Sequence, residues 1–415
     1  MKKDLKILEQ VPAVKEELEE VAREGARRLL REAMEEEVEE FLGRKRYERR
    51  EENRGYRNGY GKARSIAMGM GSIKVCPPRV SDVREGDCFR SKILSRYQRT
   101  SMTTKALLAN LYLEGLSSGD FEPVFRVLLG ETAPLSASSI LCLKQRWQGE
   151  YETWKGRSLK SQYAYCWADG VYLKAGCEEE KTALLVVLGV NEEGKKELLA
   201  IEEGYRETSE SWGELLRNLR KRGVEEIGLL IGDGNLGLWS ALREVFPKAK
   251  EQRCWNHKAL NVMDKLPKRL QKEVRGSLGD IWGAPTEAEC RRRAEAYVER
   301  LKKEGQEKAA ECVMRDWDQL VTFYQFPKAH WKHLRTTNPI ESVFAGTRLR
   351  TNVTKRMKSQ KAGLYLVWKL IQRLSENWQE IEGKEWIQAV LSGKRFKDGV
   401  IEEEKMEERE VKKER

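Results

Sequence analysis

The sequence predicts a multidomain α/β protein, in which a mixed sheet flanked by helices follows N-terminal helical regions and is interrupted by an all-α insertion. Three observations lead to this prediction. The chain has 415 residues, too many for one ordinary domain. Residues 160–265 alternate between strand and helix patterns. Residues 1–42, 96–155 and 267–335 have helical patterns alone, so we expect the sheet to lie between helical regions.

Charge and composition favour a polyanionic partner. The chain is 35% charged, with a net charge of +11 and a pI near 9.1. Residues 44–64 contain nine Lys and Arg against three acidic residues, and residues 328–361 contain nine against one. Many basic proteins bind no nucleic acid, so this clustering carries more weight than the total charge.

Cysteine spacing and hydropathy argue against four classes of protein. The eight cysteines form no Cys-x-x-Cys pair, which disfavours a zinc ribbon and a disulfide framework. The apolar run at 183–190 is far shorter than a membrane span, and the N-terminus lacks a signal-peptide pattern. We therefore expect a cytoplasmic, nucleoid-associated protein with reduced thiols and no membrane contact.

Residues 1–95 are expected to form a helical and basic region for DNA binding or dimerisation, with a small β element. Apolar residues recur at helical spacing over residues 18–41, and Gly43 ends the pattern. For this helix we favour docking or dimerisation over direct DNA contact. The segment 44–64 mixes basic residues with tyrosine and glycine, so it is either a DNA contact or a solvated loop. Its expected DNA contacts are Arg44, Lys45, Arg46 and Arg57.

Residues 96–157 are expected to form a helix-turn-helix DNA-binding domain. Helical patterns cover residues 103–113, 121–129 and 140–154, with a Gly-rich turn and a Ser-capped turn between them. This order is typical of a helix-turn-helix, although three-helix bundles without DNA binding are common. Lys144 and Arg146 on the third helix are the expected contacts.

Residues 158–266 and 336–378 are expected to form the catalytic domain. Strand patterns at 163–173, 182–191 and 196–203 are followed by helix 209–222, strand 227–231, helix 236–245, strand 250–253 and helix 255–266. Three strands in hairpins followed by β-α-β-α is the order of an RNase H-like core.

The rest of the chain divides into an insertion, two helices and a tail. Residues 267–335 are expected to form an α-helical insertion domain, and helices at 338–350 and 363–378 follow it. Residues 379–415 are expected to form a charged C-terminal tail, because the chain ends in EEEKMEEREVKKER.

One carboxylate, Asp169, lies within the first strand pattern of this core. Tyr165, Trp167 and Val171 share its face, because strand side chains alternate with period two. Burying a bare charge costs several kcal/mol, so a carboxylate here has to be paired, protonated or bound to metal.

Two further carboxylates are candidates for the same site. Asp233 directly follows strand pattern 227–231, at the end where ligands gather in α/β sheets, and Glu341 begins a helix within a basic segment. Phosphodiester cleavage is served by two divalent ions roughly 3.5–4 Å apart, which two or three carboxylates can hold. We therefore expect Asp169, Asp233 and Glu341 to hold two Mg²⁺ or Mn²⁺ ions.

Each carboxylate also has an ordinary structural explanation. Asp169 starts an Asp-Gly turn signal, Asp233 precedes a helix that it could cap, and Glu341 could pair with Arg348 or Lys355. Taken singly, these explanations are at least as good as catalysis. The combination of a strand Asp, a strand-end Asp and a helix Glu among basic residues is more specific.

The motif QRCWNHK places Cys254, His257 and Lys258 just after the last strand pattern. His257 is either a hydrogen-bonded core residue or a catalytic donor to the scissile phosphate, and Lys258 is an expected DNA contact. Cys254 and His257 are too few ligands for a structural zinc site. Around Glu341, the expected DNA contacts are Arg348, Arg350, Lys355 and Arg356.

Four stretches are informative together: ADGVYLK around Asp169, IGDGNLGLWSAL around Asp233, QRCWNHK, and TTNPIESVFAGTRLRT around Glu341. With FLGRKRYER, RNGYG and LEGLSSGDFEPV, they resemble the bacterial insertion-sequence transposases of the mutator-like superfamily. The resemblance covers nearly the whole chain. It implies that Asp169, Asp233 and Glu341 are a DDE catalytic triad, and that Cys254 and His257 match the Cys/Asp-x-x-His signature of the family.

The resemblance also implies an activity and partners. The enzyme would bind the terminal inverted repeats of its element through residues 1–155, then cleave and transfer DNA strands with Mg²⁺ or Mn²⁺ into target DNA. Two ends must be held together, so we expect a homodimer or higher multimer on double-stranded DNA. The alternatives are a non-catalytic DNA-binding regulator derived from a transposase and an RNase H-like nuclease. The complete triad argues against the regulator.

Overall fold

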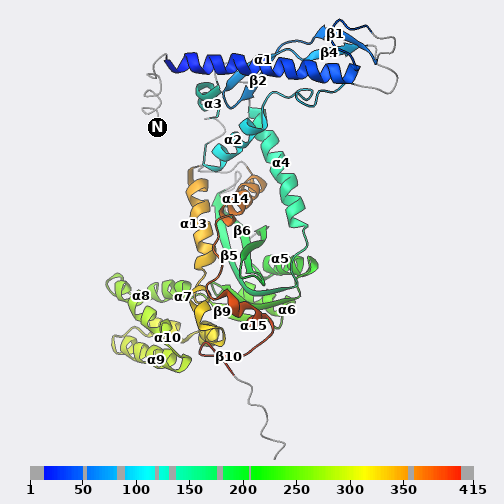
Figure 1. The fold of residues 1–415 in the computed structure, drawn as a ribbon. Coiled ribbons are helices and arrows are strands. Elements are labelled where there is room, and N and C mark those ends of the chain that lie inside the picture. Colours follow the sequence, from blue (N-terminus) through cyan, green and yellow to red (C-terminus); the bar gives the residue numbers. More distant parts are fainter. Residues whose placement is uncertain are drawn as a thin grey trace, which may run out of the picture. The chain divides into compact units, whose positions relative to one another are not determined.

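The structure is a computed structural model that describes residues 14–49, 54–81, 89–116, 121–129, 137–174, 181–204, 207–353 and 359–402. Its contacts divide the chain into two compact units, Met1–Gln145 and Arg146–Arg415, each described here by itself. The boundary falls within helix α4 (Ala137–Lys155), so it is coarser than the five regions expected from the sequence. Figure 1 labels the elements.

The first unit contains one long helix, α1 (Val14–Leu42). Met34, Val38 and Leu42 are buried, and their spacing of four residues puts them on one face of the helix. Met34 belongs to a small core with Ile66 and Ile73. The expected N-terminal helix is therefore confirmed from Val14 onward, and residues 1–13 lie outside the described part.

Two small antiparallel sheets accompany α1. Strand β1 (Tyr56–Tyr60) pairs with β4 (Pro78–Ser81), and β2 (Arg64–Met68) pairs with β3 (Gly71–Val75). The β element expected near residues 65–90 is thus confirmed, with one more pair of strands than its sequence pattern suggested.

Three helices follow, as expected: α2 (Met102–Leu113), α3 (Phe121–Leu129) and α4. The Ser101 side chain caps α2 by accepting a hydrogen bond from Thr104 N at 3.2 Å. The Phe121 ring lies between those of Tyr112 and Phe125, with centroids 6.1 and 5.8 Å away. The use of these helices as a helix-turn-helix stays a prediction.

The second unit contains a five-stranded mixed sheet with the order β7-β6-β5-β8-β9. Its strands are β5 (Gln162–Lys174), β6 (Lys181–Val190), β7 (Lys196–Gly204), β8 (Glu226–Gly232) and β9 (Lys250–Arg253). The first three pair antiparallel, whereas β8 runs parallel to β5 and β9 runs parallel to β8. The five strand patterns read from the sequence are therefore confirmed.

Different side chains cover the two faces of this sheet. Helices α5 (Ser209–Lys221) and α6 (Leu236–Val245) bury Trp212 and Trp239 in a core with Cys166. Tyr165 points the opposite way, because neighbouring strand residues alternate, and its ring packs edge-on against Phe326 and His330.

A set of helices follows the sheet, and the helical pattern expected for residues 267–335 is confirmed, while their role as an insertion domain stays a prediction. They are α7 (Trp255–Met263), α8 (Lys268–Trp282), α9 (Glu287–Lys303), α10 (Glu307–Met314), α11 (Trp317–Val321) and α12 (Trp331–Leu334), with the 3₁₀ turns η2 (Thr322–Gln325) and η3 (Lys328–His330). Figure 1 shows α8, α9 and α10 gathered beside the sheet. The Trp255 ring joins them to the sheet, with centroids 5.5 Å from Trp282 and 6.1 Å from Trp317.

Two longer helices return to the sheet. Helix α13 (Asn338–Val353) contacts β5, and α14 (Gln360–Ser375) contacts β7. Both were expected within a few residues of these bounds. In the described part of the chain, no helix has both the length and the apolar character that a membrane crossing requires.

The expectation that residues 379–415 form a charged tail is wrong for residues 379–402. These residues form η4 (Lys384–Trp386), α15 (Ile387–Leu391) and a hairpin of β10 (Phe396–Lys397) with β11 (Val400–Ile401). Ile381 and Ile387 are buried, and Ile381 N donates to Gly194 O at 2.9 Å. These isolated apolar anchors were too few to be recognised beside a strongly charged end.

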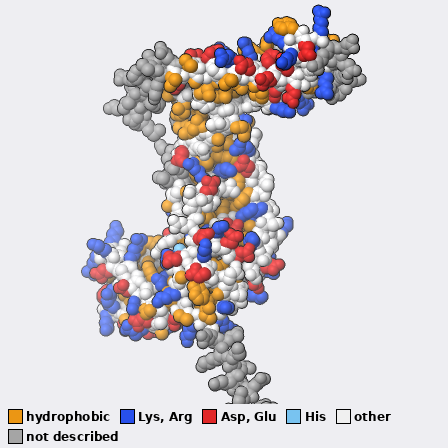
Figure 2. Space-filling view, viewed as in Figure 1, with side chains coloured by type: hydrophobic (Ala, Val, Ile, Leu, Met, Phe, Trp, Pro, Cys, Tyr) orange, Lys and Arg blue, Asp and Glu red, His pale blue; other side chains and the backbone are white. Residues whose placement is uncertain are grey.

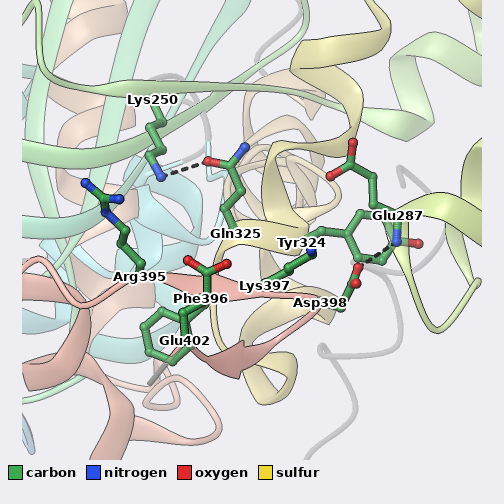
Figure 3. Close-up of a pocket in the computed structure, with 9 residues that line it drawn as sticks. All are labelled: Lys250, Glu287, Tyr324, Gln325, Arg395, Phe396, Lys397, Asp398 and Glu402. Atoms are coloured by element: carbon green, nitrogen blue, oxygen red, sulfur yellow. Dashed lines mark hydrogen bonds between the residues drawn. The ribbon is translucent and has the colours of Figure 1, made fainter. Parts of the chain in front are cut away.

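The C-terminal hairpin also lines a polar hollow of about 380 Å³ with β9, η2 and the start of α9 (Figure 3). Asp398 Oδ1 accepts a hydrogen bond from Glu287 N at 2.7 Å, and Lys250 Nζ donates to Gln325 Oε1 at 2.8 Å. The lining mixes Lys, Arg, Asp and Glu, and it includes none of the three carboxylates expected to bind metal.

Candidate active site

Asp169 and Asp233 lie on neighbouring parallel strands. In the pairing of β5 with β8, Trp167 is opposite Ile231. Asp169 is two residues beyond Trp167, and Asp233 is two residues beyond Ile231, so the two aspartates come at equivalent positions. Because paired strands lie about 4.8 Å apart, the structure places the two aspartates side by side on neighbouring inner strands.

The environment of Asp169 is not that of a turn residue. It lies inside β5, opposite Val186 of β6, and its Oδ1 accepts a hydrogen bond from Gly170 N at 2.8 Å. Burial raises the pKa of the Asp169 carboxyl to about 7; the Gly170 amide and the charge of His257 oppose this, and the charge of Asp233 adds to it. A cation would favour the ionised carboxylate, since an opposite charge lowers the pKa of an acid.

Asp233 is held by the turn that follows β8. Its Oδ1 accepts a hydrogen bond from Asn235 N at 2.8 Å. The cap of α6 is Asn235, whose side chain accepts from Gly237 N, so Asp233 is not the helix cap. Gly234 has a φ of +98°, and a Cβ there would lie 2.5 Å from Arg253 Nε, so the turn requires glycine.

Cys254 and His257 lie at the end of β9, beside β8. Cys254 N donates to Gly232 O at 2.8 Å, and Cys254 is completely buried at the start of α7. The hydrogen bond of the His257 ring with Cys254 and the charges of Asp169 and Glu341 raise the pKa of His257 to about 9, against the effect of burial. His257 is therefore protonated near neutral pH.

Glu341 reaches this imidazole from the first turn of α13. Its Oε1 lies 3.8 Å from His257 Nδ1 and accepts a hydrogen bond of 2.5 Å from Thr337 Oγ1. Thr337 N also donates to Cys254 Sγ at 3.3 Å, which joins the start of α13 to the end of β9. Glu341 is thus oriented toward His257, and we find it paired with neither Arg348 nor another described basic residue of α13.

Three possible metal ligands gather at this place. A Cys254 Sγ, a His257 ring nitrogen and a Glu341 carboxylate oxygen lie within 4.8 Å of one another. The thiol is a soft ligand and already accepts a hydrogen bond from Thr337, whereas carboxylate oxygens suit Mg²⁺ and Mn²⁺. Of these three donors, Glu341 is the one that suits a hard divalent cation, as the carboxylates of Asp169 and Asp233 also would.

Sequence reasoning missed two residues at the site. Thr337 is completely buried between Cys254 and Glu341, and threonine before a helix is usually explained as a cap. Glu207 precedes α5, and its charge raises the pKa of Asp169. It belongs to a polar, charged stretch, EEGYRETSES, that indicates only a solvated connection, so no sequence signal singled it out.

The expected DNA contacts of the first unit have varied surroundings. Lys45 and Arg46 are exposed, and the guanidinium of Arg44 lies 5.3 Å from the Tyr56 ring centroid. Arg57 is half-buried, 3.2 Å from a carboxylate oxygen of Glu39. Figure 2 shows acidic and basic side chains interleaved over this unit, so its surface is not uniformly basic.

Helix α4 carries two further expected DNA contacts, Lys144 and Arg146. Lys144 Nζ lies 5.4 Å from the centroid of the Tyr112 ring. Arg146 is exposed and pairs with Glu150 one turn later at 3.0 Å. The Lys144 side chain is half-buried and that of Arg146 is exposed, so both lie at or near the surface of α4.

One expected DNA contact in the second unit is wrong. Lys258 is completely buried, its Nζ donates to Arg315 O, and burial lowers its pKa to about 8, so it has no surface to offer a phosphate. Arg348 is exposed on α13, beside the Phe344 ring. Arg350 lies on α13, but its side chain is outside the described part, as are Lys355 and Arg356.

Comparison with known proteins identifies the family. Residues 2–381 match the model of the transposases of the Mutator family. The transposase for insertion sequence element IS6120 of Mycolicibacterium smegmatis is 44% identical over 294 residues, which are 71% of this chain and 91% of that protein. The transposase for element IST2 of Acidithiobacillus ferrooxidans is 38% identical over 279 residues, 66% of this chain and 93% of that protein. The transposase for element ISRM5 of Rhizobium meliloti strain 1021 is 30% identical over 320 residues, 76% of this chain and 78% of that protein. The chain therefore belongs to the Mutator family of transposases.

Proposed function

We propose that this protein is a DDE transposase of an insertion sequence, with an RNase H-like catalytic core and Asp169, Asp233 and Glu341 as its metal-binding triad. The observations that support the proposal are the register of the two aspartates and the contact of Glu341 with His257. The two aspartates are at equivalent positions of adjacent parallel strands, and Glu341 faces the imidazole whose charge acts on Asp169. Family membership supports the same reading of the site.

The chain's own groups would have distinct tasks in this reaction. Asp169, Asp233 and Glu341 would hold two Mg²⁺ or Mn²⁺ ions, and Thr337 fixes the orientation of Glu341. Bound metal would supply an activated water and stabilise charge on the leaving oxygen. His257, protonated near neutral pH, would donate a hydrogen bond to the scissile phosphate.

Two successive nucleophiles account for cleavage and transfer. Water first attacks the phosphodiester in line and frees a 3′-OH at the end of the element. That hydroxyl then attacks a phosphodiester of the target DNA, so one bond forms as another breaks. Positioning and charge stabilisation provide most of the rate enhancement in such reactions.

The remaining parts of the proposal concern DNA. We propose that α2, α3 and α4 act as a helix-turn-helix on the terminal inverted repeats, with the basic segment 44–64 adding phosphate contacts. Two ends have to be synapsed, so we propose a homodimer or higher multimer on DNA.

A strand-transfer assay with the full chain, DNA carrying the element's ends and Mg²⁺ or Mn²⁺ tests the proposal. Asp169→Asn and Glu341→Gln should abolish cleavage and joining while DNA binding persists. Asp264→Asn, at an exposed residue that ends α7, is the matched control and should remain active. Full activity of either triad variant would defeat the assignment. Cleavage without joining would indicate a nuclease, and binding without cleavage a regulator.

A further inference from the structure

A fourth carboxylate, Glu207, lies beside the two aspartates. It is in the connection from β7 to α5, immediately before Thr208, the cap of α5. A Cβ built on Gly170 would lie 2.3 Å from Glu207 Oε1 and 2.8 Å from its Cδ. The carboxylate therefore rests against the α-carbon of Gly170, and only a glycine leaves room for it.

Glu207 also touches the turn that follows β8. Its Oε2 accepts a hydrogen bond of 3.3 Å from Asn235 Nδ2. A second hydrogen bond joins it to the hydroxyl of Tyr172, on the strand that carries Asp169. The nearby charges that act on Glu207 are those of Asp233 and His257.

Two of the three residues that Glu207 contacts, Gly170 and Asn235, hold the aspartates. Gly170 N donates to Asp169 Oδ1, and Asn235 N donates to Asp233 Oδ1, both at 2.8 Å. One carboxylate thus touches both residues whose backbone amides donate to the two expected metal ligands. Mutation of groups that orient metal ligands typically lowers metal affinity or activity by about 10–100-fold.

The charge of Glu207 adds to this geometry. Glu207 adds a third negative charge close to those of Asp169 and Asp233, and like charges at this spacing repel one another. A bound divalent cation relieves that repulsion, so each negative charge near the site increases the attraction for the cation.

We propose that Glu207 is a positioning residue of the metal site: it holds the backbone segments of Asp169 and Asp233 together and strengthens divalent cation binding through its charge. This inference rests on the proposed function, because it assumes that the two aspartates bind metal. Glu207 would contribute to cation binding in two ways, through the hydrogen bonds that it accepts and through its charge. Two substitutions distinguish these contributions.

The test measures Mn²⁺ affinity of the full chain without DNA, by calorimetry and by the electron paramagnetic resonance signal of free Mn²⁺. Glu207→Ala removes both contributions and should weaken Mn²⁺ binding by about 10–100-fold. Glu207→Gln keeps an oxygen that can accept the hydrogen bond from Asn235 Nδ2, so it should fold like the wild type in EDTA and weaken Mn²⁺ binding by a smaller factor than Glu207→Ala.

Glu203→Gln is the matched control. Glu203 is an exposed carboxylate on β7, four residues earlier, and the charges that act on it are those of Lys155 and Lys361. This variant makes the same change in net charge and should bind Mn²⁺ like the wild type. Equal weakening in Glu203→Gln and Glu207→Gln would overturn the proposal, because the effect would then come from net charge alone.

A further variant separates this inference from the proposed function. If Asp233→Asn loses Mn²⁺ binding while both Glu207 variants bind like the wild type, the metal site is right and the role of Glu207 is wrong. If Asp233→Asn binds Mn²⁺ as tightly as the wild type, the metal site itself is wrong, and the inference fails with it. Loss in Asp233→Asn with graded losses in the two Glu207 variants supports both.

Discussion

Replacing Thr337 by valine tests whether the hydroxyl between β9 and α13 sets the position of Glu341. Valine has nearly the shape of threonine, so the change leaves no cavity at this completely buried residue. It removes the hydroxyl that donates to Glu341 Oε1 at 2.5 Å. The backbone hydrogen bond from Glu341 N to Thr337 O, at 2.9 Å, is unaffected. The hydroxyl also lies 3.2 Å from Cys254 Sγ and 3.4 Å from His257 Nδ1, so the substitution is directed at these side chains and not at the helix.

The expected magnitudes follow from this geometry. A hydrogen bond to a charged group contributes about 1.5–3 kcal/mol to stability. The Glu341 side chain is 38% exposed, so water replaces part of the loss and the lower figure applies. A loss of about 1.5 kcal/mol lowers the melting temperature of a unit of this size by roughly 3–6 °C. Loss of a group that orients a metal ligand lowers activity or metal affinity by about 10–100-fold.

The assay compares Thr337→Val with Thr337→Ser in strand cleavage at increasing Mg²⁺, alongside thermal melting in EDTA. Serine keeps the donor, so Thr337→Ser should cleave nearly as well as the wild type. Thr337→Val should need more Mg²⁺ and cleave more slowly even when saturated. If Thr337→Val and the wild type show the same Mg²⁺ dependence of cleavage and the same cleavage rate at saturating Mg²⁺, Thr337 does not position Glu341 and the reasoning is refuted.

Three further predictions concern stability and DNA contact. Burial and two nearby lysines lower the pKa of His333 from 6.5 to about 4. Between these pH values the unfolded chain binds more protons than the folded chain, so the folded state loses stability as the pH falls from 6.5 to 4. The melting temperature of His333→Asn should fall less over this range than that of the wild type; equal falls would contradict the assignment. Arg348→Gln should reduce the slope of log K for DNA binding against log salt concentration by about 0.9, whereas Lys258→Met should leave that slope unchanged. A reduced slope for Lys258→Met would show that Lys258 does contact DNA phosphate. Gly189→Ala should cost about 1–3 kcal/mol in thermal or urea unfolding, because its Cβ would lie 2.6 and 2.8 Å from two core side chains. Gly276 lies in α8, and a Cβ built there would have nothing within 4 Å, so Gly276→Ala should raise the free energy of unfolding by about 0.5–1 kcal/mol. A lower free energy of unfolding for Gly276→Ala would show that the space around a glycine does not decide the effect of alanine.

The sheet could be predicted in detail because its signals are local. Buried strands such as β5 and β6 have continuous or alternating apolar residues, and the turns between elements carry glycine and polar residues. The parallel pairing of β5 with β8, which places Asp169 beside Asp233, is consistent with the predicted order of elements. The folded segment 379–402 was missed because a few buried residues, such as Ile381 and Ile387, anchor it through contacts with distant parts of the chain.

The sequence by itself determined the order of the helices and strands and three carboxylates in suitable places, because backbone preferences and apolar periodicity act over a few neighbouring residues. Only the tertiary structure decided the surroundings of each group. It buried Lys258, set Thr337 between Cys254 and Glu341, and laid Glu207 against Gly170. Apart from the hydrogen bond between Thr337 and Glu341, these contacts join residues tens of positions apart. Burial and charge depend on what the fold brings together, which no local pattern encodes.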